Sequence, residues 1–243
     1  DEHDFSVEIT DSSGATVRTF DGPAEPGVNE ILWNWRHDAP YETRAGEGGG
    51  GRGRGSGTPQ GPIVMPGQYT VTLHVGEDDF SSTVEIQADP RRSMTMADRR
   101  ARQDALMSLN HLAAPLFEAT QAAQRLTDQM EEAKSLLEEY EGGSEALTET
   151  LAEIQEELEA VRTALGEARA WAGVGSAIQG SSTLPTEDQL WQVDAAWQAV
   201  PPLVERLNVL IEISVPAFNG ALDAEGVRPD PGAPLPVPAR RGG

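Results

Sequence analysis

The sequence contains no cysteine, which excludes disulfide bonds, thiolate metal sites and cysteine nucleophiles. It also lacks an apolar run of about 18 residues, so no membrane-spanning helix is predicted. Its first residues show neither the basic segment nor the apolar core of a signal peptide. We therefore expect the chain to begin within a longer protein or after processing, and the missing cysteines leave its compartment open.

Basic residues are scarce. The 18 arginines and lysines stand against 40 aspartates and glutamates, which gives a net charge of −22. A polyanion of this size is repelled by nucleic acid and by an anionic membrane surface. We therefore expect protein partners, with no nucleic acid and no direct membrane insertion.

The composition changes along the chain and predicts three parts. Residues 1–93 hold short alternating segments, turn clusters and most of the glycine. Residues 94–224 are rich in Ala, Leu, Glu and Gln with few turn signals, which is typical of long helices. Residues 225–243 are rich in proline without an apolar period, so an extended tail is predicted.

The first part alternates apolar and polar residues with a period of two, which predicts strands over residues 5–9, 15–20, 28–36, 66–75 and 80–88. Turn clusters separate these segments, and residues 11–14 are predicted to join the first two as a hairpin. Roughly five to seven short strands indicate a small antiparallel β-sandwich. Trp33 and Trp35 lie two apart in this alternation, so both should face the same side.

The second part repeats apolar residues at alternating spacings of three and four, which keeps one seam on one helix face. Two short interruptions divide the pattern into helices that we expect to pack as an antiparallel bundle. Pro115, the pair Pro201 and Pro202, and Pro216 should each kink or restart a helix, giving three helices or a kinked four-helix arrangement. Thr186 is a candidate N-cap. The predicted seam residues are Leu109, Leu112, Leu116, Ala119, Ala123, Leu126, Met130, Ala133, Leu137 and Tyr140; then Leu147, Leu151, Ile154, Leu158, Val161, Leu165 and Ala168; then Leu190, Val193, Trp197, Val200, Val204, Leu207 and Ile211.

Turn and core residues of the first part carry a resemblance. The matching positions are Gly14, Val17, Arg18, Gly27, Trp33, Arg36, Asp38, Ala39, Pro40, Gly61, Pro62, Pro66, Gly67, Tyr69, Asp89, Pro90 and Arg91. In these residues the chain resembles the immunoglobulin-like module of flagellar hook-capping proteins, in the version that follows the β-propeller of large exported bacterial Asp-box, or sortilin-like, proteins. Residues 184–190 and 207–219 are similar to the C-terminal helical region of those proteins. The resemblance implies an α+β multidomain protein that is exported, periplasmic or extracellular. The propeller and its Asp-box repeats are missing here, so no catalytic residue is carried over.

A glycine tract at residues 48–57 contains Arg52 and Arg54. It lies within a predicted inserted loop, residues 45–61, between two strands of the sandwich, and long surface loops are well tolerated. We interpret it as such a loop. The alternatives are contact of Arg52 and Arg54 with a partner, and a phosphate cradle; the cradle lacks the G-x-x-x-x-G-K-[ST] pattern and a following helix.

No catalytic, cofactor-binding or metal-binding residue is predicted. His3, His37, His74 and His111 lie far apart without metal-ligand spacing, and no calcium loop or serine elbow occurs. Several glutamates fall outside the apolar seams, which favours a solvated acidic face over acid–base chemistry; a weak cation site or a basic partner is the alternative. These are Glu131, Glu132, Glu138, Glu139, Glu141, Glu156, Glu157 and Glu159.

The tryptophans of the helical part suggest an interface. Trp171, Trp191 and Trp197 either fill one end of the bundle or form a patch for a partner, because exposed tryptophan is common at interfaces. Residues 172–185 are predicted to be a long connection whose apolar Val174 and Ile178 are candidate contacts. The candidate interface residues are Arg52, Arg54, Trp171, Val174, Ile178, Trp191 and Trp197.

These observations predict a non-catalytic structural and protein-interaction module that docks onto a larger assembly through its acidic helices and a free sheet edge. The chain either supports its own propeller or acts as an accessory subunit that clamps a membrane-embedded complex, of the respiratory or photosynthetic reaction centre type, from the periplasmic side. A different alternative is an accessory domain of a propeller glycosidase that binds carbohydrate over Trp33 or Trp35.

Overall fold

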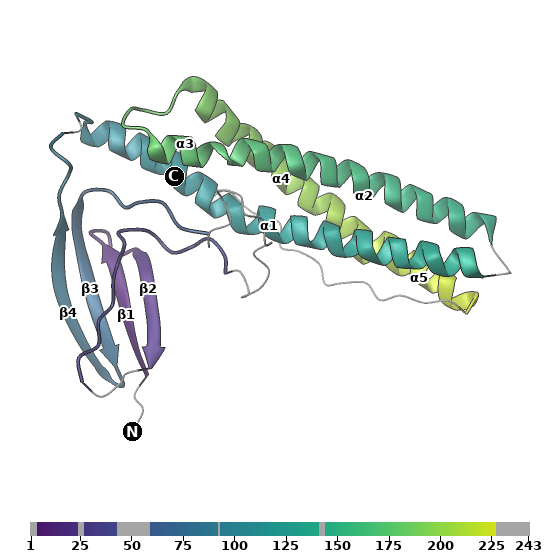
Figure 1. The fold of residues 1–243 in the computed structure, drawn as a ribbon, viewed down its shortest axis with the longest axis horizontal. Helices are drawn as coiled ribbons and strands as arrows, with labels where there is room; N and C mark the ends of the chain where they lie inside the picture. The colour runs from purple at the N-terminus through teal and green to yellow at the C-terminus, as the bar shows by residue number, and fades with distance from the viewer. Residues whose placement is uncertain (1–3, 24–26, 43–58, 92, 141–143, 227–243) are drawn as a thin grey trace. The chain divides into compact units, whose positions relative to one another are not determined.

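The computed structural model describes residues 4–23, 27–42, 59–91, 93–140 and 144–226. Arg52, Arg54, His3, most of the predicted glycine-rich loop and nearly all of the predicted tail lie outside these residues. The fold is of the α+β class, with a four-stranded antiparallel sheet followed by three long helices (Figure 1). Contacts divide the chain into two compact units, Asp1–Asn110 with Ser176–Pro185, and His111–Gly175 with Thr186–Gly243. The first unit therefore takes in helical residues beyond the predicted boundary at residue 93.

The sheet of the first unit consists of β1 (Asp4–Asp11), β2 (Thr16–Pro23), β3 (Gly67–Val75) and β4 (Asp78–Ile86), in the order β2-β1-β3-β4 (Figure 1). The predicted hairpin between the first two strands is confirmed. Its turn is closed by the Asp11 carboxylate, which accepts hydrogen bonds from the backbone N–H groups of Ser13 (2.8 Å) and Ala15 (3.1 Å) and from the Ser13 hydroxyl. Burial opposes ionisation of Asp11, but these hydrogen bonds outweigh it and lower its pKa.

The core of this unit lies on one face of the sheet. Its buried residues are Ile9, Val17, Val64, Tyr69 and Ile86, with Phe20, Trp33 and Val71 packed against them. The Trp33 ring meets Tyr69 edge to face at 5.5 Å, and its Nε1–H donates to the carbonyl of Arg36. The backbone around Trp33 and Val64 thus covers this face of the sheet.

The strand predicted over residues 28–36 is wrong. Within it, only Arg36 forms a β-bridge, an isolated one with Ile63. Trp35 has φ of 57°, a left-handed conformation that strands do not allow. The alternation of side chains breaks there, so Trp33 points into the core while Trp35 is exposed, and the two do not face the same side.

Helical residues complete the first unit. Helix α1 (Met96–Glu139) begins with a reciprocal cap, in which the Thr95 hydroxyl accepts from the Asp98 N–H and the Asp98 carboxylate accepts from the Thr95 N–H. The Arg102 guanidinium then donates to the carbonyls of Ile178 and Gln179, and the Gln179 side chain accepts from the Ile63 N–H at 2.9 Å. These bonds tie the start of α1 to the end of α3 (Val174–Gly180).

The second unit contains the rest of α1, with α2 (Glu145–Ala172), α4 (Glu187–Val209), a π-helical turn η1 (Leu210–Ser214) and α5 (Val215–Ala224). Every predicted seam residue of α2 is buried. The same holds for α1 and α4 except for Tyr140 and Leu190, which lie at helix ends. Thr186 forms the predicted cap, as a capping box with Gln189.

Two of the three predicted proline sites do not restart a helix. Helix α1 continues through Pro115, and α4 continues through Pro201 and Pro202, so no restart occurs there. Before Pro216 the backbone widens into the turn η1, and the Val215 N–H bonds to the Leu210 carbonyl five residues back. Proline has no N–H and its ring crowds the carbonyl four residues earlier, so the wider turn relieves that crowding.

One ion pair joins α2 to α4. Arg206 donates two hydrogen bonds to the Glu157 carboxylate, at 2.7 and 2.9 Å, and these lower the pKa of Glu157. A carboxylate whose pKa is lowered on folding stabilises the folded state at pH values above its unfolded-state pKa. This stability is lost as the pH falls through its folded-state pKa. Both side chains are about two-fifths exposed, at 41% and 42%, so we expect less than about 1 kcal/mol.

The pair predicts a small dependence of stability on pH. Glu157→Gln should lower the free energy of unfolding at pH 7, and the difference from wild type should shrink as the pH falls below the ordinary glutamate pKa of 4.5 and vanish below the lowered folded-state pKa of Glu157. Urea unfolding at several pH values measures this difference. Glu156→Gln, one residue away on the exposed side of α2, is the matched control and should show no such difference. A Glu157→Gln effect that persists at low pH would contradict the ionic origin.

Candidate functional site

Two tryptophans come together in the second unit. Trp171 lies in the last turn of α2 and Trp191 in the first turns of α4. The rings contact edge to face, with centroids 6.1 Å apart and planes at 74°. This is a favourable geometry for an aromatic pair. The Thr186 capping box fixes the start of α4 and therefore the position from which Trp191 projects.

The pair remains accessible to a partner. The Trp191 residue is 58% exposed and Trp171 is half-buried. Leu190, next in sequence, is 43% exposed, and the acidic Glu187 and Asp188 precede it in the first turn of α4. We call Trp171, Leu190 and Trp191 the aromatic patch. It offers exposed apolar side chains, and aromatic residues are enriched at protein contacts.

The other predicted interface residues are placed differently. Trp197 is buried, so of the three tryptophans only Trp171 and Trp191 reach the surface. Val174 and Ile178 are also buried. The connection that carries them contains the short helix α3 instead of a continuous loop.

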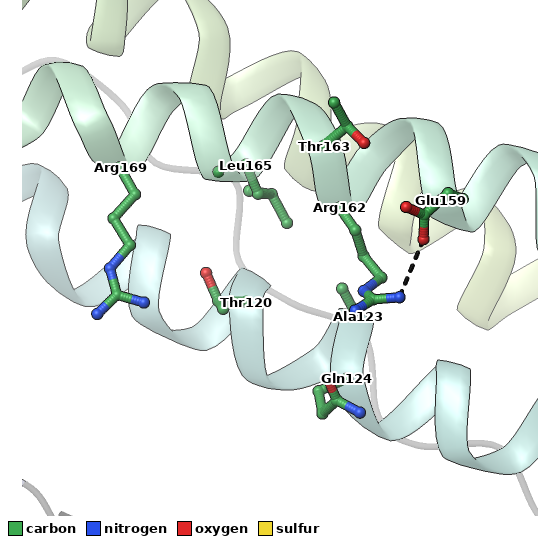
Figure 2. A pocket seen from close by; sticks show the side chains of 9 residues that line it. Thr120, Ala123, Gln124, Glu159, Arg162, Thr163, Leu165 and Arg169 are labelled. Atoms are coloured by element: carbon green, nitrogen blue, oxygen red, sulfur yellow. Dashed lines mark hydrogen bonds and ion pairs between the residues drawn. The ribbon is translucent and has the colours of Figure 1, made fainter. Parts of the chain in front are cut away.

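A shallow groove of about 270 Å³ runs between α1 and α2 (Figure 2). Arg162 and Arg169 lie two turns apart on α2, and Figure 2 shows both guanidinium groups pointing towards α1, near Thr120 and Gln124. Arg162 pairs with Glu159 at 3.0 Å. The Thr120 hydroxyl donates to the Leu116 carbonyl of its own helix. The groove therefore presents arginines in a strongly acidic chain, and sequence reasoning missed it. The signal was their spacing of seven on one helix face.

The positions of the glutamates and histidines bear on whether they could bind a metal or carry out acid–base chemistry. Glu131, Glu132, Glu138, Glu139, Glu156 and Glu159 are exposed, as the solvated-face interpretation predicts. His74 contacts Asp79 at 2.6 Å and lies 3.9 Å from Glu8, while His37 bonds to Gln103. Over the described residues, no group of His, Asp or Glu side chains has the arrangement of a metal site.

The two tryptophans considered for carbohydrate binding, Trp33 and Trp35, lie in different environments. Trp33 packs into the sheet core and Trp35 is 58% exposed. A sugar platform on this unit would therefore rest on Trp35 alone.

Comparison with known proteins found no relative of this chain. The chain matches no family model, no curated protein and no solved structure. Among the described helices, none combines the length and apolar character needed to cross a membrane.

Proposed function

We propose that the chain is a non-catalytic structural and protein-interaction module that docks onto and stabilises a larger assembly. In this proposal the sheet unit is an immunoglobulin-like module and the long helices form an antiparallel bundle. The observation that carries it is the aromatic patch, in which Trp171 supports a Trp191 that is more than half exposed. Isolated exposed apolar residues are ordinary, but tryptophan is enriched among interface hot spots, and here an exposed Trp191 is held edge to face against Trp171.

The assembly is proposed to lie on the periplasmic or extracellular side. The proposal has two forms. In the first, the chain supports the β-propeller of the same protein; in the second, it is an accessory subunit that clamps a membrane-embedded complex. The acidic character supports a protein partner over nucleic acid or bare membrane in both forms. Intact mass spectrometry of the native protein after gentle extraction and size-exclusion chromatography separates them. A mass near 26.0 kDa within a large complex supports the subunit, and a several-fold larger chain supports the propeller.

The aromatic patch gives a mutational prediction. Trp191→Ala should weaken binding to the stoichiometric partner by about tenfold or more, because hot-spot tryptophans typically contribute at least about 2 kcal/mol. The measurement is the dissociation constant of the purified partner for wild-type and variant chains by surface plasmon resonance. Unchanged thermal unfolding of the second unit shows that the loss is one of contact.

Trp35→Ala is the matched control, because Trp35 and Trp191 have the same exposure of 58%. It should leave partner binding unchanged. Equal losses from both variants would contradict the assignment of the patch. A loss of oligosaccharide binding in Trp35→Ala alone would instead favour the carbohydrate-binding alternative.

A further inference from the structure

The edge strand β4 leaves backbone groups unpaired. Val75 pairs with Asp78 across the two-residue turn that joins β3 to β4, and the register continues without a shift to Gly67 and Ile86. Residues that flank such a turn exchange hydrogen bonds, and bonded pairs then alternate along the ladder. Even-numbered β4 residues therefore bond to β3. The peptide groups of Asp79, Ser81, Thr83 and Glu85 point away from the sheet, and no hydrogen bond from another described residue reaches them.

The opposite edge of the sheet is protected. On β2, the Val17 carbonyl accepts from the Asp38 N–H at 2.9 Å, and the Asp38 carboxylate accepts from the Thr19 N–H. Arg18 pairs with Asp38 at 3.3 Å, and the β1–β2 register contains an irregularity after Ile9. Natural sheets cover or distort free edges in these ways because an open edge accepts another strand. Strand β4 has no proline, no lysine and no register shift.

The side chains of β4 define the strand that would fit. On one face, Phe80 is 60% exposed and Val84 is 41% exposed, and both are open to apolar cross-strand neighbours. On the other face, Asp79 and Glu85 stand at the two ends of the exposed row, with Ser81 and Thr83 between them. Cross-strand neighbours on this face should therefore be basic at the ends and polar in the middle.

A second copy of the chain fits this edge poorly. Antiparallel pairing of β4 with itself about Ser82 would place Asp79 beside Glu85 at both ends. Like charges directly opposite each other destabilise a strand pair. The net charge of −22 adds long-range repulsion between copies. The acidic ends thus discourage self-pairing and remain compatible with a basic strand.

We propose that β4 is a docking edge for an extended segment of a partner protein, with basic side chains opposite Asp79 and Glu85 and apolar side chains opposite Phe80 and Val84. The segment adds as the next strand of the sheet, so its backbone satisfies the outward groups of β4. This recognition by strand addition takes affinity from backbone bonds and specificity from alternate side chains. It extends the proposed interaction function to a second surface and rests on that function.

The test uses the full chain and the synthetic peptide acetyl-Lys-Val-Thr-Val-Thr-Val-Lys-amide, which matches this pattern. Binding should protect the amides of Asp79, Ser81, Thr83 and Glu85 from hydrogen exchange, because these four N–H groups gain partners. Thr83→Pro should weaken binding at least about tenfold, since proline removes an N–H that points outward and is not used by β3. Thr83→Val, which keeps that N–H, is the matched control and should bind like wild type.

A charge exchange tests specificity independently of the proline. Glu85 makes no hydrogen bond or ion pair with another described side chain. Glu85→Lys should weaken binding of the lysine peptide and allow binding of the equivalent peptide in which glutamate replaces only the lysine opposite residue 85, because Asp79 still requires a basic neighbour. This variant keeps the proposal falsifiable if Thr83→Pro disturbs the sheet, which loss of exchange protection at the β3 amides would reveal.

The proposal is overturned if the lysine peptide gives no protection of the outward amides, or if the two peptides bind wild type equally. It is also overturned if sedimentation shows a dimer of the chain that Thr83→Pro dissociates, because the edge then serves a second copy. Trp191→Ala should bind the peptide like wild type. If wild type does not bind the peptide while Trp191→Ala still weakens binding to the partner, the edge proposal alone is refuted. If wild type binds the peptide while Trp191→Ala leaves partner binding unchanged, the aromatic patch alone is refuted.

Discussion

Replacing Leu207 by alanine should lower the free energy of unfolding of the helical unit by about 2–5 kcal/mol. Leu207 has no exposed surface and lies in the last turn of α4, in the buried seam between Val204 and Ile211. Truncation removes apolar surface from the core and leaves a cavity that rigid neighbouring helices fill only partly. Denaturant unfolding, monitored through hydrogen exchange of the amides in α2 and α4, measures the loss of stability in this unit.

Leu190→Ala is the matched control. It is the same substitution in the same helix at a residue that is 43% exposed, and it should change stability by less than about 1 kcal/mol. The contrast tests the packing of the three helices, because only a buried seam makes the two leucines differ. Similar losses for both variants would show that α4 does not bury its Leu207 face as described.

The helical seams could be predicted from sequence because one periodicity controls both local structure and burial. Residues spaced three or four positions apart lie on one helix face. The period that indicates a helix therefore also predicts which residues are buried, as for Leu158 and Val161. The prediction failed only at helix ends. Tyr140 follows the last residue of α1 and Leu190 lies in the first turn of α4, where neighbouring helices no longer cover them.

The sheet unit was less predictable because alternation alone does not ensure that a segment joins a sheet. Residues 28–36 alternate like a strand, yet the left-handed backbone of Trp35 reverses its side chain. Hydrogen bonds from the Trp33 indole and to the Trp35 carbonyl stabilise this conformation. The second bond comes from the N–H of the distant Val64, a contact that a local pattern does not contain.

The candidate site shows the same limit. Sequence composition indicated a group of tryptophans near one end of the helices, but pairing of Trp171 with Trp191 requires that α2 and α4 run antiparallel in a particular register. Whether Trp197 belongs to the surface or the core follows from the helix face it occupies. Its position in the α4 seam already placed it inside, and the structure buries it.

Gly61→Ala should destabilise the sheet unit by about 1–3 kcal/mol or more, as overpacking of a tight contact does. A Cβ atom on Gly61 would lie in steric conflict with the backbone carbonyl oxygens of His37 and Asp38. A backbone atom cannot rotate away as the end of a side chain can. The two segments are held together by the hydrogen bond from the His37 N–H to the Pro62 carbonyl and by that from Arg36 to the Gly61 carbonyl, both 2.9 Å.

The conflict should therefore separate the 36–38 segment from the 61–64 segment and loosen the cover over the sheet core. Faster hydrogen exchange at the His37 and Val64 amides, with no change in the amides of α2, would localise the damage. Gly220→Ala in α5 is the control: its added Cβ meets no atom within 4 Å, and alanine in a helix should stabilise by about 0.5–1 kcal/mol. A neutral Gly61→Ala would contradict the close approach, and Gly61 would then serve only as flexible backbone. A localised loss would show that this glycine is required where the 61–64 segment approaches residues 36–38.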